Sequence, residues 1–309
     1  MAARRTEAAR AALGLAALLF GAAAWSAPLT VCMAADNPPL SWQAGGAPRG
    51  LDVRIAGAAA AAMGRELVVV PFESEYEKES TLAHEVNALL SSGVCDAASG
   101  FPLLAGDFGT PTRASARTPD YPGARRKRER PFIVLGPLAA GRAYQAVSLG
   151  LVQRGGSPPL NGLADLGERK LGVTTGTLGG AVAMVWRNGA LRSRSVSLGQ
   201  REDLLGELAR ADARFDAALL PLAMFDGWRL QHADGELVAS PWRRPIGVNL
   251  GFVTLQPAAD VRSAIDGVIG SALADGRLAR WAADEGVSWT APTAPEVSRG
   301  PSLADLAAD

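Results

Sequence analysis

The chain has 309 residues, and its 31 Lys and Arg residues balance its 31 Asp and Glu residues. This balance argues against a polyanionic partner. The low aromatic content, without interleaved basic residues, argues against nucleic-acid binding. Two His and two Cys residues that lie far apart in the sequence do not make a zinc site. We expect no bound metal, no cofactor and no nucleic-acid partner.

Residues 1–26 have the pattern of a signal peptide. Arg4, Arg5 and Arg10 form a basic region, and residues 11–24 are an apolar run that is too short to span a bilayer. Small residues fit cleavage near positions 24–26, and an uncleaved anchor is the alternative. Since no later apolar stretch is long enough to cross a membrane, we expect an exported, periplasmic protein without stable membrane insertion.

The first part of the chain alternates apolar runs with helical patterns. A helix is expected over residues 50–64, because Leu51, Ile55, Ala59 and Met63 share one face. Such a β-α-β-α-β order predicts a parallel sheet. The expected strands are residues 29–33, 67–72 and 95–99, with a second helix over 81–90.

The two cysteines belong to two of these strands. Cys32 lies in the first, and Cys95 opens the third. An isolated pair in an oxidising compartment often forms a disulfide, and we expect one if the strands are neighbours. The alternative is two buried free thiols. A Cα separation below about 7 Å is the geometric test.

Residues 106–131 interrupt the alternation. The segment is rich in Pro and Gly and predicts a long exposed loop. A solvated, mobile insertion is one interpretation, and a docking patch for an acidic partner is the other. Its seven basic residues are Arg113, Arg117, Arg125, Arg126, Lys127, Arg128 and Arg130.

The second half repeats the alternation. A Thr/Gly-rich turn over 174–180 runs into a helix that ends at Trp186, and it is either an anion site or an ordinary helix cap. From about residue 292 we expect a disordered tail. The expected strands are 145–153, 170–173, 195–198, 215–220 and 248–255, with helices over 201–210, 260–273 and 276–285.

One phrase occurs in both halves. A helix end and a polar turn precede Asp96-Ala-Ala, and the same elements precede Asp216-Ala-Ala. Each Asp-Ala-Ala opens a buried strand. Two similar α→β units far apart in the chain predict two similar lobes with a cleft between them, where ligands bind.

Several motifs, in this order, resemble the family 3 solute-binding proteins, which serve ABC importers of polar amino acids and similar small molecules. The helix that starts at Gly50-Leu-Asp-Val resembles the family's glycine–aromatic–Asp–Val helix. Residues 87–100, the elements Ala164-Asp165-Leu166 and Thr175-Gly176-Thr177, and Ala274-Asp275-Gly276 with Trp281 are similar to further family elements. The resemblance covers most of residues 29–287, outside the basic insertion.

The resemblance implies an α/β protein with the two-lobed type II periplasmic-binding-protein fold. Each lobe is expected to be a mainly parallel sheet flanked by helices, with the cleft between the lobes. The expected limits are residues 1–26 for the signal peptide, 28–143 and 241–290 for lobe 1 with the insertion 106–131, 144–240 for lobe 2, and 291–309 for the disordered tail.

Ligand contacts are expected where strands end at the cleft. The family binds α-carboxylates with an Arg in a Thr-Pro–x–Arg setting, and Thr110-Pro111-Thr112-Arg113 is similar to it. The family's acidic partner for a ligand ammonium is replaced near Pro221. The candidate ligand-binding residues are Asn37, Trp42, Ser99, Gly100, Phe101, Arg113, Thr175, Gly176 and Thr177.

Three functions remain open. The first is a solute-binding protein that captures a small polar, organic-acid-like or amino-acid-like ligand for an ABC permease. The second is an accessory protein of a periplasmic quinoprotein (methanol-type) dehydrogenase, because Val31-Cys32, Asn37-Pro38-Pro39 and Gly93-Val94-Cys95-Asp96 resemble a subgroup associated with those enzymes. The third is an enzyme on the same fold. Its dense carboxylates Glu73, Glu75, Glu77 and Glu79 are expected to be exposed, so we expect no enzyme and no catalytic residues.

Overall fold

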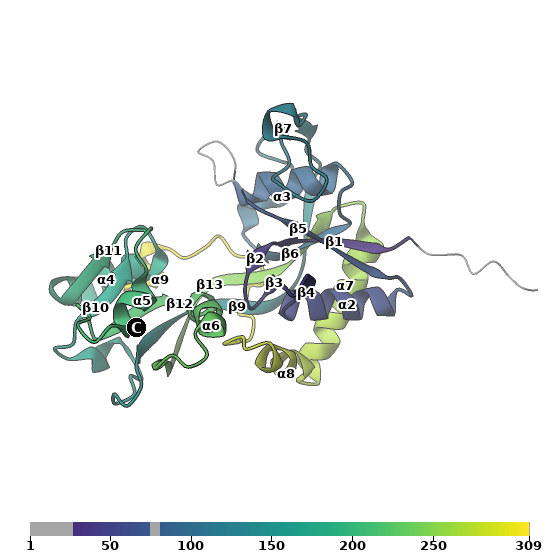
Figure 1. Ribbon diagram of the computed structural model, residues 1–309. Coiled ribbons are helices and arrows are strands. Elements are labelled where there is room, and N and C mark those ends of the chain that lie inside the picture. Colours follow the sequence, from purple (N-terminus) through teal and green to yellow (C-terminus); the bar gives the residue numbers. More distant parts are fainter. Residues whose placement is uncertain (1–26, 75–80, 309) are drawn as a thin grey trace, which may run out of the picture.

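The computed structural model describes residues 27–74 and 81–308, so the predicted signal peptide lies outside the described residues. An eight-stranded sheet runs through the molecule in the order β11-β10-β12-β9-β13-β6-β1-β5. Figure 1 shows helices on both sides of this sheet and two lobes along its length. The predicted two-lobed α/β fold is confirmed.

Lobe 1 is built on three parallel strands, β5 (Leu67–Phe72), β1 (Leu29–Ala34) and β6 (Ala97–Pro102). Alternate residues of β1 serve opposite faces of the sheet. Leu29, Val31 and Met33 pack under α2 (Leu51–Ala62), α7 (Ala259–Ala274) and α8 (Arg277–Asp284). Cys32 faces the other side, in the core beneath α3 (Leu82–Ser91).

Lobe 2 repeats this arrangement with β11 (Ser195–Leu198), β10 (Leu171–Thr174) and β12 (Ala217–Pro221), which are parallel. One face packs against α4 (Leu178–Val185) and α9 (Leu303–Ala307). The other face packs against α5 (Leu204–Ala209) and α6 (Leu222–Gln231). The lobes therefore have separate cores on each face of a shared sheet.

Two long antiparallel strands join the lobes. They are β9 (Leu138–Arg154) and β13 (Leu237–Leu255), and they pair with each other in both lobes. Their register shifts between Pro245 and Asn249, opposite Ser148 and Ala146. The strands expected over 145–153 and 248–255 are thus parts of much longer strands that cross between the lobes.

Smaller elements complete the described chain. The remaining strands are β2 (Asp36–Asn37), β3 (Ser41–Ala44), β4 (Ala47–Arg49), β7 (Ser115–Ala116) and β8 (Ile133–Val134). Short 3₁₀ helices occupy Ala105–Asp107, Lys127–Glu129, Leu163–Leu166, Trp186–Gly189 and Arg192–Arg194. Within the described ranges, no helix combines the length and the apolar character needed to cross a bilayer.

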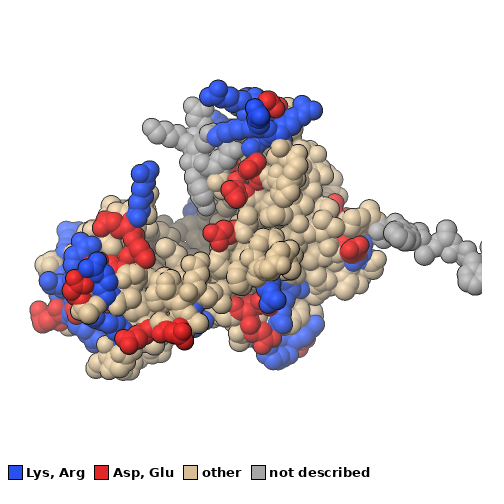
Figure 2. All heavy atoms as spheres, viewed as in Figure 1, with Lys and Arg blue, Asp and Glu red and all other residues tan. Residues whose placement is uncertain are grey.

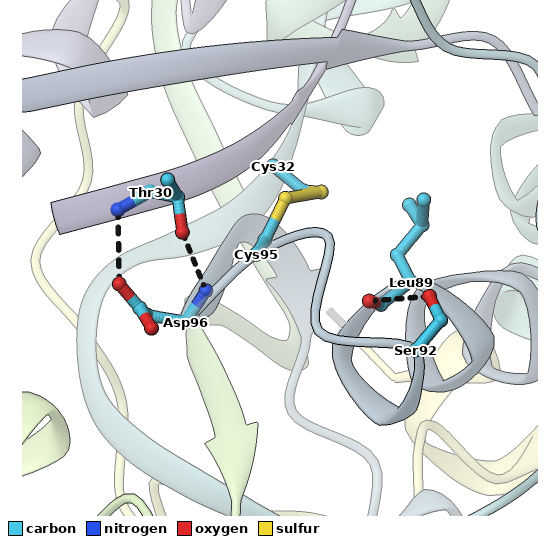
Figure 3. Close-up of a disulfide and its surroundings, with 6 residues drawn as sticks. All are labelled: Thr30, Cys32, Leu89, Ser92, Cys95 and Asp96. Atoms are coloured by element: carbon cyan, nitrogen blue, oxygen red, sulfur yellow. Dashed lines mark hydrogen bonds between the residues drawn. A yellow bond between two sulfur atoms is a disulfide. The ribbon is translucent and has the colours of Figure 1, made fainter. Parts of the chain in front are cut away.

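The predicted disulfide is present. Cys32 of β1 is bonded to Cys95, and their Cα atoms lie 5.7 Å apart. Figure 3 shows the bond beside Asp96, whose carboxylate accepts a hydrogen bond from the Thr30 N–H at 3.0 Å. The Asp96 N–H in turn donates to the Thr30 carbonyl oxygen at 2.9 Å. These contacts fasten the start of β6 to the start of β1.

The C-terminal segment is ordered, which corrects the predicted disorder from residue 291 on. The buried Asn249 side chain donates to the carbonyl oxygen atoms of Thr293 and Glu296, at 2.8 and 2.9 Å. Farther along, Arg244 donates to the carbonyl oxygen atoms of Asp305 and Ala308. Figure 1 shows this segment passing from lobe 1 to α9 on lobe 2. Buried polar groups far away in sequence hold it, so composition alone did not reveal its order.

The basic insertion is also more structured than an exposed loop. Arg130 is buried and donates hydrogen bonds to the carbonyl oxygen atoms of Thr118 and Arg125, both at 2.8 Å. It also pairs with Asp120 at 3.1 Å. Basic side chains gather at the outer end of lobe 1 near β7 (Figures 1 and 2). The guanidinium group of Arg117 lies 4.4 Å from the ring centre of Phe132.

Candidate functional site

A pocket of about 480 Å³ lies in lobe 1, where β1, β5 and β6 end. Asp36 and Asn37 line it after β1, and Glu73 and Ser74 line it after β5. Residues 99–101 of β6 also contribute to its wall. Parallel strands place their carboxyl ends at the same edge of a sheet, which is where α/β proteins bind ligands. The pocket has the position and the size of a small-molecule site.

A second pocket of about 210 Å³ adjoins the first and lies between the lobes. The two pockets share Asn37 and Gly100. Gln145 and Ser148 of the crossing strand β9 line the second pocket, together with Asp226 of α6. The combined site thus extends from lobe 1 to the strands that join the lobes.

A buried carboxyl group lies behind the pocket wall. Asp52 is in the first turn of α2 and is fully buried. A Cβ atom at Gly100, which has φ +64°, would approach the Asp52 carboxyl group to 3.2 Å. Burial raises the pKa of Asp52 to about 6, although the nearby Tyr144 and Ser99 hydroxyl groups lower it. Gly100 therefore permits close contact between the wall and this group.

The Asp226 carboxylate belongs to the second pocket and is nearly fully buried. It accepts hydrogen bonds from the N–H and the hydroxyl group of Ser288, both at 2.6 Å. Burial raises its pKa, while these bonds and the charges of Arg229 and Arg243 lower it. Asp226 ties the segment after α8 to lobe 2 at the base of the cleft.

Some polar atoms at the pocket walls lack partners. In the wall of the first pocket, the Ser99 hydroxyl group interacts with the Asp52 carboxyl group. In the second pocket, Gln145 Oε1 and Ser148 Oγ have no hydrogen-bond partner among the described protein atoms. Each of these side chains is less than 8 % exposed. Buried polar groups normally have partners, so these atoms mark places where a solute or water completes the bonding.

Four of the residues predicted from the sequence meet at this site. Asn37, Ser99, Gly100 and Phe101 all line the first pocket. Trp42 lies on β3 and borders a separate space of about 10 Å³, which has room for one water molecule. The roles of all five in ligand binding stay predictions.

Arg113 and the Thr175–Thr177 turn line neither pocket. Arg113 is exposed in the insertion, where its charge lowers the pKa of His84, second to the effect of burial. Thr177 caps α4: its Oγ1 atom accepts from the Gly180 N–H at 3.1 Å and donates to the Thr174 carbonyl oxygen at 2.7 Å. The turn has the geometry of an ordinary helix cap.

Several wall residues were missed by the sequence analysis. Asp36, Gln145 and Ser148 were not singled out, and Glu73 was assigned to an exposed acidic stretch. Asp36 and Glu73 could have been found from the sequence, because each lies within two residues of the end of a parallel strand. The signal for Gln145 and Ser148 was hidden, because β9 was expected to begin at residue 145. Among the described residues, no cluster of His, Cys, Asp and Glu has the arrangement of a metal site.

Comparisons with known proteins support the fold. No protein-family model matches the chain, and no curated protein matches it. Substrate-binding domain 2 of GlnP from Lactococcus lactis, solved in an open conformation, has a TM-score of 0.61 and 13 % identity over 85 % of this chain and 96 % of its own.

Two further solved structures are similar. The second substrate-binding domain of a putative amino-acid ABC transporter from Streptococcus pneumoniae has a TM-score of 0.58 and 13 % identity, over 84 % of this chain and 100 % of its own. The L-cystine solute receptor of Neisseria gonorrhoeae, unliganded and open, has a TM-score of 0.54 and 15 % identity, over 84 % and 92 %. The chain therefore has the fold of periplasmic solute-binding proteins.

Proposed function

We propose that this protein is an exported solute-binding protein that captures a small polar solute between its lobes and presents it to the permease of an ABC importer. The observation that carries the proposal is the pair of adjoining pockets, one of about 480 Å³ at the strand ends of lobe 1 and one of about 210 Å³ between the lobes. Asn37 and Gly100 belong to both pockets, so a solute there contacts lobe 1 and the crossing strands together.

Closure of the lobes is the proposed mechanism. The strands β9 and β13 cross between the lobes near residues 146–148 and 245–249, where their register shifts. Small backbone rotations there swing one lobe toward the other, as hinge closure requires. A solute that contacts both lobes stabilises the closed state by its differential affinity.

The similar solved structures are binding proteins, which favours a binding role over an enzymatic one. One is named as a domain of an amino-acid ABC transporter and another as an L-cystine solute receptor, and an importer partner for this chain is inferred by analogy. The dehydrogenase-accessory role receives no support from these comparisons, so we do not propose it.

The proposal is tested by thermal shift and calorimetry of the mature protein with amino acids, amines, organic acids and sugars. We expect at least one solute to raise the melting temperature and to reduce the radius of gyration in small-angle scattering. Asn37→Ala is expected to weaken that binding about tenfold, because the side chain that lines both pockets can no longer hydrogen-bond the solute. Asn161→Ala, at an exposed position in lobe 2, is the matched control. If no class of solute produces a shift or a compaction, the proposed function is wrong.

A further inference from the structure

We infer that the solute is an organic cation rich in N–H donors, such as a primary amine or a guanidinium compound. The inference rests on the proposed function and names the ligand class of the same site. Its basis is the charge and hydrogen-bonding character of the pocket walls. Both properties point to the same chemistry.

Every charged residue in the described walls of the two pockets is acidic. Asp36 and Glu73 line the first, and Asp226 lines the second. Neither wall contains Lys, Arg or His among the described residues. An anionic solute would therefore meet like charges without a counter-ion, and a cationic solute would meet opposite charges.

Asp36 and Glu73 are available to a ligand. Both side chains are exposed, and the described residues provide no ion-pair partner within 4.0 Å of either. Asp226 differs, since Ser288 binds it and Arg229 lies 3.8 Å away. The attraction for a cation thus comes mainly from the first pocket.

The nearby end of helix α3 does not make the first pocket electropositive. Leu82 and Val86 of α3 line the wall, so the positive N-terminal end of that helix lies nearby. Glu85 occupies its first turn, and its carboxylate accepts a hydrogen bond from the Ser74 hydroxyl group at 2.5 Å. This carboxylate offsets the partial positive charge at the N-terminal end of the helix.

The unpartnered wall atoms are independent evidence for a donor-rich ligand. Gln145 Oε1 is an acceptor, and the hydroxyl group of Ser148 can accept as well. Both side chains are more than nine-tenths buried. Ammonium and guanidinium groups carry several N–H donors and no acceptor, so they match this arrangement. A carboxylate has acceptors alone and leaves Gln145 Oε1 unpartnered.

The test compares probes by calorimetry with the mature protein at low ionic strength. Putrescine and agmatine are the donor-rich cations, choline is a cation without N–H donors, glutamine is a zwitterion, and succinate is a dianion. We expect putrescine or agmatine to bind at least about tenfold more tightly than choline, because charged hydrogen bonds are lost with choline. Glutamine and succinate are expected to bind more weakly still. Added salt is expected to weaken binding of the diamine.

Matched variants identify the groups responsible. Glu73→Gln and Asp36→Asn each keep the shape of the side chain and are each expected to weaken agmatine binding about tenfold. Asp234→Asn, at an exposed carboxylate outside both pockets, is expected to leave it unchanged. Tighter binding of succinate or glutamine than of either amine overturns the ligand class and leaves the proposed function standing. Equal binding of choline overturns the role of the donors. Absence of binding by all five probes overturns the ligand class, and the proposed function falls as well only if the broad panel of amino acids, amines, organic acids and sugars also gives no binding.

Discussion

Both lobes contain the same hydrogen-bonded joint between the starts of two neighbouring parallel strands, but different side chains hold the strands together beside it. In lobe 1, Asp96 accepts a hydrogen bond from the Thr30 N–H beside the start of β1. In lobe 2, Asp216 accepts one from the Lys170 N–H beside the start of β10, at 2.8 Å. The Asp96 and Asp216 N–H groups each return a bond of 2.9 Å to the carbonyl oxygen of the same partner residue. The Asp of each repeated Asp-Ala-Ala sequence therefore forms two reciprocal hydrogen bonds with a residue of the neighbouring strand, and we call this pair of bonds the clamp.

The residues around the clamp differ between the lobes. Cys32 pairs with Ala98 in lobe 1, and Gly172 pairs with Ala218 in lobe 2, so Cys32 and Gly172 are equivalent. Cys95 precedes one clamp and Phe215 the other. The disulfide of lobe 1 thus corresponds to an aromatic ring over glycine in lobe 2, where a Cβ atom at Gly172 would lie 2.4 Å from the Phe215 ring. The two strands are held together by a covalent bond in lobe 1 and by side-chain packing in lobe 2.

The packing of lobe 2 gives the largest expected effect. Phe215 is 1 % exposed, and Phe215→Ala is expected to cost about 3–5 kcal/mol of unfolding free energy because a cavity forms beside Gly172. Urea unfolding measures the loss. Phe132→Ala, at a ring that is 63 % exposed, is the control and is expected to change the stability little. A loss below about 1 kcal/mol for Phe215→Ala would show that packing of the ring against Gly172 does not hold the two strands together.

The disulfide of lobe 1 gives the next effect. Replacing both Cys32 and Cys95 by Ala removes a cross-link over a sequence separation of 63 residues. A disulfide that closes such a loop stabilises a protein by about 2–4 kcal/mol, chiefly because it lowers the conformational entropy of the unfolded chain. Hydrogen exchange is expected to rise in β1, β6 and α3 and to stay unchanged in β10, β12 and α5. Reduction of the wild-type protein should reproduce the pattern, and equal loss of protection in both lobes would contradict it.

Much of the fold could be predicted from the sequence because it follows from local patterns. The Cys pair, the two Asp-Ala-Ala strands and the helix after Gly50 indicated two lobes and the disulfide. The crossing strands were underestimated, because Gly141, Pro241 and Pro245 interrupt their patterns.

The order of the C-terminal segment and part of the candidate site depend on long-range contacts. Asn249 binds the main chain 44 residues later, at Thr293. The approach of Asp52 to Gly100 joins α2 to β6. Neither contact can be predicted from a local pattern in the sequence. Asn37, Ser99, Gly100 and Phe101 were predictable because they follow or end strands, whereas Asp52 looked like an ordinary acidic residue in a first helical turn.

Asp52 marks a second difference between the lobes, and it predicts a pH effect. Asp52 is the second residue of α2, and Gly179 is the second residue of α4, where a Cβ atom would lie 2.6 Å from the Leu219 carbonyl oxygen. The pKa of Asp52 is raised by burial from 3.8 to about 6. The folded protein therefore keeps a proton that the unfolded chain releases. The contribution of this proton to stability is present below about pH 4 and is lost as the pH rises through about 6.

Asp52→Asn removes this titration. Relative to the wild-type protein, the stability of the variant is expected to rise by roughly 2–3 kcal/mol between pH 4 and pH 7. Urea unfolding at several pH values measures this difference, with Asp234→Asn as the exposed control. A stability difference that stays constant over this range would show that the Asp52 carboxyl group does not titrate in it.

The clamps themselves give the smallest expected effect and compare the lobes most directly. Asp96→Asn and Asp216→Asn each replace a charged acceptor of a backbone N–H by a neutral one. We expect about 1 kcal/mol of lost stability for Asp216→Asn. The loss should be slightly larger for Asp96→Asn, because Asp96 also pairs with Arg65 at 2.9 Å, and this partly exposed ion pair adds a few tenths of a kcal/mol. High salt should reduce the additional loss of stability in Asp96→Asn and leave the loss of stability in Asp216→Asn nearly unchanged. Equal losses at all salt concentrations would show that the Arg65 pair adds nothing and that the two clamps are energetically alike.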